Sequence, residues 1–204
     1  MRASTIVPAS ILILMPAVSP GAEPATIGGP PAGGNAARNA AVSETFAALA
    51  PSSPETARAA FERFKALAGT WDGRSTKGWE ETLRYQVIAG GSVVFETSFE
   101  AHPGEEMATA FHMDGDRLML THYCMAKNQP RLEATGFEDG GRTVVFTFKD
   151  GTNIPTRDRG HMDKAVFRFE APDRVTSRWT WYQDGKETWF EEIVQIRRLA
   201  APAP

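Results

Sequence analysis

The sequence contains one cysteine, four histidines and no excess of basic residues. A single cysteine excludes an internal disulfide framework and any zinc site built from several cysteines. Lysine and arginine number 22 against 25 aspartates and glutamates, and the resulting formal charge of −3 disfavours nucleic acid as a partner. Gly-x-Ser-x-Gly, His-Glu-x-x-His and phosphate-loop motifs are also missing. These absences favour a binding protein over an enzyme, and no cofactor is implied.

Long apolar runs are missing as well. The apolar segment near the N-terminus, Ile11–Met15 extended through Val18, is far shorter than the roughly 20 residues that a membrane-spanning helix needs. It follows Arg2 and precedes the small residues Ser19–Ala22, which is the order typical of an export signal. We expect residues 1–22 to be a signal peptide, so that the mature protein is secreted or periplasmic without inserting into a membrane.

Large side chains are scarce in the next segment, "PATIGGPPAGGNAARNAA". Such a composition cannot bury enough apolar area to offset the entropy lost on ordering. We therefore expect residues 23–52 to form a flexible Gly/Pro/Ala-rich spacer and residues 199–204 a disordered tail. The folded domain would be 53–198.

A helix is predicted at the start of this domain, in "SSPETARAAFERFKALAG". Ser53 is a good N-cap, Pro54 suits the first helical position, and Glu55 complements the helix dipole. Apolar residues then recur at helical spacing, and Gly69 fits the stop. The apolar positions are Ala57, Ala60, Phe61, Phe64 and Leu67.

After Gly69 the apolar residues alternate with period two, and short Gly- and Asp-containing turns recur at regular intervals. In one such segment Val93, Phe95, Thr97 and Phe99 share a face, whereas Glu96, Ser98 and Glu100 share the other. This pattern predicts an all-β domain in which about ten strands form an antiparallel up-and-down meander. Closure into a barrel would remove the sheet edges, and a barrel of this size leaves room for a ligand cavity. The helix would lie over one end of the barrel.

"LAGTWDGRS", Leu67–Ser75, contains the Gly-x-Trp signature that begins the first strand of lipocalin-like proteins, and the layout resembles the calycin group with nitrobindin-like strand order. The motifs "DGDRLMLTHYC", "NQPR", "GTNI", "HM" and "WTWYQDGKE" resemble a family of uncharacterised bacterial exported proteins with a lipocalin-like domain. The resemblance covers roughly Phe61–Arg198 and implies that Trp71 closes the barrel floor. Members of that family often have His-Met-His where this chain has His161-Met162-Asp163.

The strand after Arg117 holds the most suggestive polar residues. Leu118, Leu120, His122 and Cys124 alternate onto one face, and the two leucines indicate that this face points inward. His122 would then be a core histidine satisfied by a neighbouring hydroxyl, a ligand contact, or a metal ligand or catalytic base. Cys124 would be a small buried apolar group or a second contact.

Further candidates lie in the turn after Cys124, in the long loop that contains Asn153, and among the tryptophans. The turn amides could equally fix the backbone, and core packing is the ordinary role of a tryptophan. We expect the ligand contacts to come from His122, Cys124, Asn128, Gln129, Asn153, His161, Trp179 and Trp181.

Three functions remain open from the sequence. The first is binding of a small, mostly apolar ligand inside the barrel. The second is metal binding by His122, Cys124 and His161, which requires the long loop to fold back. Nitrobindin-like barrels hold haem through a histidine near the chain end, and "FEEIVQIRRLAAPAP" has none. The third is an enzyme that uses Cys124, although His122 on the same strand is poorly placed as its base.

Overall fold

The computed structural model describes residues 53–198. The predicted signal peptide, spacer and tail lie outside the described residues, so those predictions stay untested. Within 53–198 one helix, α2 (Pro54–Lys65), precedes ten strands and a short 3-10 turn, η2 (Ala89–Gly91). The strands are β1 (Gly69–Ser75), β2 (Glu80–Ile88), β3 (Val93–Ser98), β4 (Met107–Asp114), β5 (Arg117–Tyr123), β6 (Gln129–Glu138), β7 (Thr143–Thr152), β8 (His161–Ala171), β9 (Arg174–Gln183) and β10 (Lys186–Arg197).

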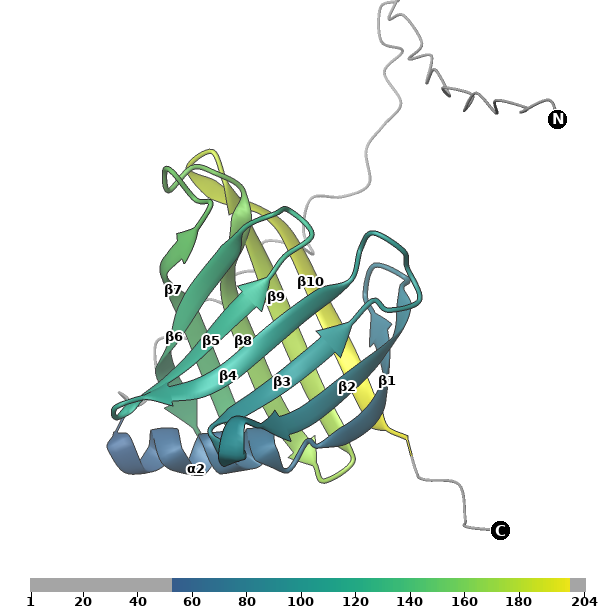
Figure 1. Cartoon of the computed structure of the whole chain (residues 1–204), viewed down its shortest axis with the longest axis vertical. Helices are drawn as coiled ribbons and strands as arrows, with labels where there is room; N and C mark the ends of the chain where they lie inside the picture. Colours follow the sequence, from purple (N-terminus) through teal and green to yellow (C-terminus); the bar gives the residue numbers. More distant parts are fainter. Residues whose placement is uncertain (1–52, 199–204) are drawn as a thin grey trace, which may run out of the picture. The chain divides into compact units, whose positions relative to one another are not determined.

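The strands form a closed antiparallel barrel, as predicted (Figure 1). Each strand pairs with the next along the chain, and β1 closes the sheet against β10 with Trp71 opposite Arg197. Because the connections alternate between the two ends, the α2 end also carries the β2–β3, β4–β5, β6–β7 and β8–β9 turns. The other five connections gather at the opposite end, which we call the loop end.

Helix α2 begins at the predicted cap. The Ser53 side chain accepts a hydrogen bond from the Thr56 backbone N–H at 3.1 Å, and Pro54 occupies the first helical turn. The helix ends at Lys65, earlier than the predicted stop. Gly69 instead begins β1 with a φ of +134°, a conformation that a residue with a Cβ rarely adopts.

Aromatic side chains close the α2 end of the barrel. Figure 1 shows α2 lying across this end. Phe64 from the helix stacks on Phe111 with ring centroids 4.3 Å apart, and it meets Phe146, Phe167 and Phe169 edge-on. These contacts make the helix part of the barrel core, as the apolar stripe predicted.

Trp71 is fully buried at the same end, which confirms its predicted place at the barrel floor. Its indole Nε1–H donates to the Leu67 carbonyl at 2.7 Å. The Arg197 guanidinium lies 4.4 Å from the ring centroid and donates to the Ala66 and Ala68 carbonyls beyond the helix C-terminus. Trp71 and Arg197 therefore join the first strand, the last strand and the helix end. Among the described residues, no helix is long and apolar enough to span a membrane.

Candidate functional site

A small cavity lies inside the barrel, and we call it the acidic cavity. Its volume is about 30 Å³. Three carboxylates line it from different strands, Glu81 on β2, Glu96 on β3 and Glu191 on β10, and all three are buried. His122 on β5 and Trp179 on β9 line it as well. A space of this size holds about one water-sized group.

The alternation of the strands turns these acids inward. On β3 the buried positions are Val94, Glu96 and Ser98, whereas Val93 and Phe95 on the other face are only half-buried. The inward face of this strand is thus the more polar one. Charged side chains are almost never fully buried unless they are paired, so buried glutamates in a barrel point to a function.

The same inward direction holds for the acids of β2 and β10. Glu81 alternates with Leu83 and Tyr85, and Glu191 alternates with Ile193 and Gln195, all of them buried. Opposite Glu81, Gly73 on β1 leaves room for the cavity wall. A Cβ added at Gly73 would lie 2.6 Å from Leu83 Cδ1 and 2.9 Å from Glu81 Cγ.

Burial governs the protonation of the acids. It raises the pKa of Glu81 to about 7, with the Glu191 charge adding to the rise and the Phe99 backbone N–H opposing it. Burial also raises the pKa of Glu96 to about 8, assisted by the charge of Glu81 and opposed by the Tyr85 hydroxyl. Two glutamates in the barrel therefore titrate near neutral pH.

Part of the polar lining is satisfied within the barrel. Tyr85 Oη donates to Gln195 Oε1 at 2.8 Å, and Gln195 Nε2 donates to Ser177 Oγ at 3.0 Å. The Ser75 hydroxyl donates to the Glu191 carboxylate. These bonds hold β1, β2, β9 and β10 in register around the cavity.

Two groups on the cavity wall lack partners. The two Glu81 carboxylate oxygens and His122 Nε2 have no hydrogen-bond partner of normal geometry among residues 53–198. The Phe99 backbone N–H that opposes the rise in the Glu81 pKa acts on this carboxylate from outside that geometry. His122 Nδ1 lies 3.1 Å from Thr109 Oγ1, and its ring packs 5.1 Å from Trp179. Burial lowers the pKa of His122 to about 4, so the imidazole is neutral at pH 7 and keeps Nε2 available.

An aromatic cover lies over the cavity at the loop end. We define it as Phe99, Trp79 and His102, whose ring centroids lie 5.6 to 6.0 Å apart. Phe99 itself lines the acidic cavity and is buried. Its φ of +60° is strained for a bulky residue, and such strain clusters at functional sites.

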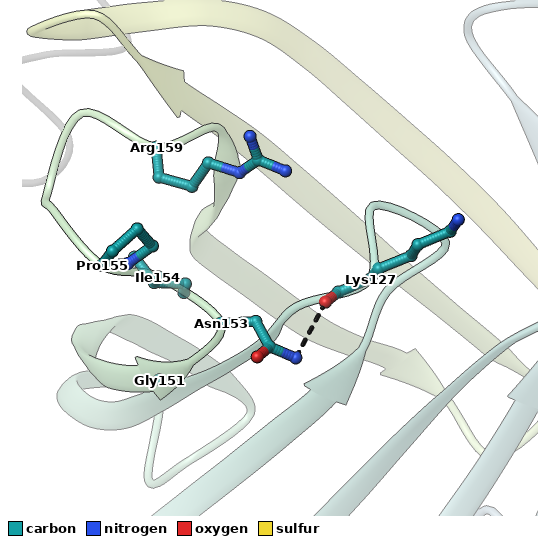
Figure 2. A pocket seen from close by; sticks show the side chains of 6 residues that line it. All are labelled: Lys127, Gly151, Asn153, Ile154, Pro155 and Arg159. Atoms are coloured by element: carbon teal, nitrogen blue, oxygen red, sulfur yellow. Dashed lines mark hydrogen bonds between the residues drawn. The ribbon is translucent and has the colours of Figure 1, made fainter.

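The larger hollow of about 550 Å³ lies on the protein surface beside the β7–β8 loop (Figure 2). Figure 2 shows Asn153 bonded through its side-chain amide to the Lys127 carbonyl, at 3.1 Å, while Arg159 extends from the other arm of the loop. Lys127, Asn153 and Arg159 are all exposed. The hollow is open to solvent, so its polar groups need no ligand to be hydrated.

The structure does not bring the predicted site residues together in one place. His122 and Trp179 line the acidic cavity, with His122 inward as predicted. Asn153 lines the surface hollow and contacts Gln129 Oε1 at 3.4 Å. Asn128 donates to the Gly160 carbonyl at 2.8 Å and so ties two connections of the loop end together. The role of these residues as ligand contacts stays a prediction.

Cys124 is buried just beyond the end of β5 and, unlike His122, does not line the acidic cavity. Its backbone N–H bonds the Asn128 carbonyl at 3.1 Å. Burial raises the pKa of its thiol, which opposes formation of the nucleophilic thiolate. The enzyme hypothesis that uses Cys124 therefore gains nothing from its surroundings.

His161 belongs to the base of the β7–β8 loop and does not line the acidic cavity. It is fully buried, and its two ring nitrogens contact the Arg157 guanidinium and the Arg159 carbonyl. Arg157 in turn lies 3.8 Å from the Tyr182 ring centroid and pairs with Asp163. Asp163 thus anchors the loop through Arg157.

Trp181 packs half-buried against the core and donates to Gln183 Oε1 at 3.2 Å. It pairs with Met162 of β8, a residue of the cavity wall, but does not itself line the acidic cavity. Across 53–198, no three His, Cys, Asp or Glu side chains are placed to share a metal ion. The predicted metal site of His122, Cys124 and His161 is therefore not formed. The physical reason is that contacts within the β7–β8 loop hold His161 there.

Sequence reasoning missed the glutamates of the cavity. Glu81, Glu96 and Glu191 are not among the residues that the sequence singles out. The available signal was the position of Glu96 between Val94 and Ser98, but which face of β3 points inward follows only from the closed sheet.

No protein-family model matches the chain, and no curated protein matches it. Among solved structures, a protein of unknown function from the DUF3598 family of Nostoc punctiforme aligns with a TM-score of 0.45 and 11% identity over 66% of this chain. The chain spans 49% of that protein's length. A phycobiliprotein lyase of Guillardia theta aligns with a TM-score of 0.33 and 11% identity over 69% of this chain and 93% of its own. The resemblance to exported bacterial proteins stays a prediction.

Proposed function

We propose that this protein binds a small, mostly apolar molecule with a polar end inside its barrel, at the acidic cavity. The observation that carries the proposal is the set of unpartnered atoms on the cavity wall, the two Glu81 carboxylate oxygens and His122 Nε2. A buried polar group without a hydrogen bond costs about 1–3 kcal/mol, and a ligand that supplied the bond would recover this free energy.

The surroundings support the same function. Leu83, Met162, Ile193 and Trp179 line the cavity beside the polar groups. Small-molecule sites are usually built in this way, from apolar walls with a few convergent polar groups. The cavity holds only one water-sized group in the present conformation. A larger molecule enters when the aromatic cover moves, and the strained Phe99 backbone favours such a movement.

We further propose that the barrel works outside the cytoplasm, after loss of residues 1–22. The order of charge, apolar segment and small residues in the N-terminal sequence supports this location. An extracytoplasmic carrier or sensor of a small molecule is consistent with both parts of the proposal.

Calorimetric titration of a co-purified molecule into the parent, His122→Ala and His122→Gln tests the interior site. His122→Ala should weaken binding by about 1–3 kcal/mol, since a buried polar group of the ligand would lose its hydrogen-bond partner. His122→Gln, which can also donate and accept a hydrogen bond, should recover part of the affinity. Equal affinities in all three proteins, with unchanged melting, would remove His122 from the site.

A further inference from the structure

The charge of the acidic cavity has one sign. Glu81, Glu96 and Glu191 contribute three carboxyl groups, and none of the described residues that line the cavity is lysine or arginine. The other polar lining residues are neutral hydroxyls and the uncharged His122. A buried carboxylate needs a cationic partner or a proton, because an isolated charge in an apolar surrounding is costly.

We propose that the acidic cavity receives the protonated amino group of a small organic amine, with Glu81 and Glu96 as its principal acceptors. The inference rests on the proposed interior binding site and names its ligand class. The unpartnered oxygens of Glu81 provide free acceptors on one wall. His122 Nε2, unpartnered on another strand, is a further polar contact that does not depend on the acids.

The size and the walls of the cavity fit an ammonium group attached to an apolar body. A volume of about 30 Å³ holds one group of the size of water, which is also the size of an ammonium head. Phe99, Met107 and Trp179 line the same cavity and can contact the carbon atoms next to that head. A bare metal ion fits less well, since the described acids are not placed to share one.

Proton exchange should accompany amine binding. The titratable groups that face the cavity are Glu81 on β2, Glu96 on β3, His122 on β5 and Glu191 on β10, with Tyr85 beside Glu96. Burial raises the pKa of Glu81 and of Glu96 to about 7 and about 8, so at pH 7 Glu96 is mostly protonated and Glu81 is partly protonated. An ammonium group that takes their place releases about one proton per bound amine, which keeps the charge of the cavity balanced.

Paired probes separate charge from shape. We suggest calorimetry at pH 7 with butylamine beside butan-1-ol and with 2-phenylethylamine beside 2-phenylethanol, each in phosphate and in MOPS buffer. Each amine should bind at least about tenfold more tightly than its alcohol, because charge-assisted hydrogen bonds are stronger than neutral ones. The binding enthalpy should differ between the two buffers by the amount expected for release of a proton.

Matched variants test which carboxyl groups bind the amine. Glu81→Gln and Glu96→Gln keep the side-chain shape and should each lower amine affinity by about tenfold or more without weakening alcohol binding. Glu80→Gln, the same change at the exposed neighbour of Glu81, should leave both affinities unchanged. Thermal melting of every variant checks that the fold is retained.

The outcomes distinguish the two proposals. Alcohols that bind as tightly as their amines, with binding lost in His122→Ala, would overturn the amine inference and leave interior binding intact. No binding by either amine at millimolar concentration would also overturn the amine inference. Protein from its native host that retains no molecule would overturn interior binding itself.

Discussion

Replacing Glu96 by glutamine should change how the stability of the barrel depends on pH. Burial, assisted by the Glu81 charge, raises the pKa of Glu96 from 4.5 to about 8 in the folded protein. Between these values the unfolded chain has released the proton while the folded chain retains it. The free energy of unfolding of the parent therefore falls as the pH rises from about 4.5 to about 8.

The magnitude follows from the size of the shift. A rise of roughly 3.5 pKa units, at about 1.4 kcal/mol per unit, corresponds to a loss of about 5 kcal/mol across this window. Because part of the rise comes from the charge of Glu81, about 3–5 kcal/mol is the expected range for Glu96 alone. Such a loss is a large fraction of the stability of an ordinary domain, about 5–15 kcal/mol.

Urea unfolding followed by tryptophan fluorescence at pH 5, 7 and 9 measures the effect. Glu96→Gln should match the parent at pH 5 and exceed it by about 3–5 kcal/mol at pH 9. His122 acts on the other side: burial lowers its pKa from 6.5 to about 4, so its stabilising contribution is lost as the pH falls through that window. His122→Gln should therefore reduce only the loss of stability that occurs as the pH falls below the pKa of a free histidine. If the free energy of unfolding falls equally steeply with rising pH in the parent and in Glu96→Gln, the burial of an ionisable Glu96 is refuted.

Three further predictions concern the floor, the wall and the N-terminus. Trp71→Ala should lower the free energy of unfolding by about 3–5 kcal/mol, as aromatic truncations in cores do, and a loss below about 1 kcal/mol would contradict the buried floor. Gly73→Ala should lower the free energy of unfolding by about 1–3 kcal/mol, because the added methyl group overpacks against Leu83 and Glu81. An unchanged urea midpoint would mean that these side chains move aside without cost. N-terminal sequencing of the exported protein should begin near Glu23, with the formal charge changed from −3 to −4 by loss of Arg2; recovery of only the intact Met1 form would contradict export.

The architecture could be predicted because its signals are local. The Ser53 cap, the apolar stripe of α2 and the period-two strands each follow from neighbouring residues, and closure of the sheet follows from the need to pair its edges. The inward position of His122 was also predictable, since Leu118 and Leu120 share its face and are both fully buried. The residues of β5 alone were therefore enough to predict the direction of the His122 side chain.

Glu96 could not be found in the same way. On β3 the more apolar face, with Val93 and Phe95, points away from the barrel interior, and Glu96 points into it. The direction of Glu96 depends on the register of the whole closed sheet, to which β3 alone is no guide. Glu81 differs, because it shares its buried face with Leu83 and Tyr85 on β2. The position of His161 depends likewise on a long-range arrangement, in which Arg157 ties the β7–β8 loop to Asp163 and Tyr182.

Native mass spectrometry of the protein purified from its native host tests the central claim most directly. The account predicts that the parent retains a small organic molecule with a basic nitrogen, and that the Glu81→Gln/Glu96→Gln double variant loses it while Glu80→Gln keeps it. A parent that carries no bound molecule, or an adduct retained equally by the parent and the double variant, would contradict the acidic cavity as the binding site.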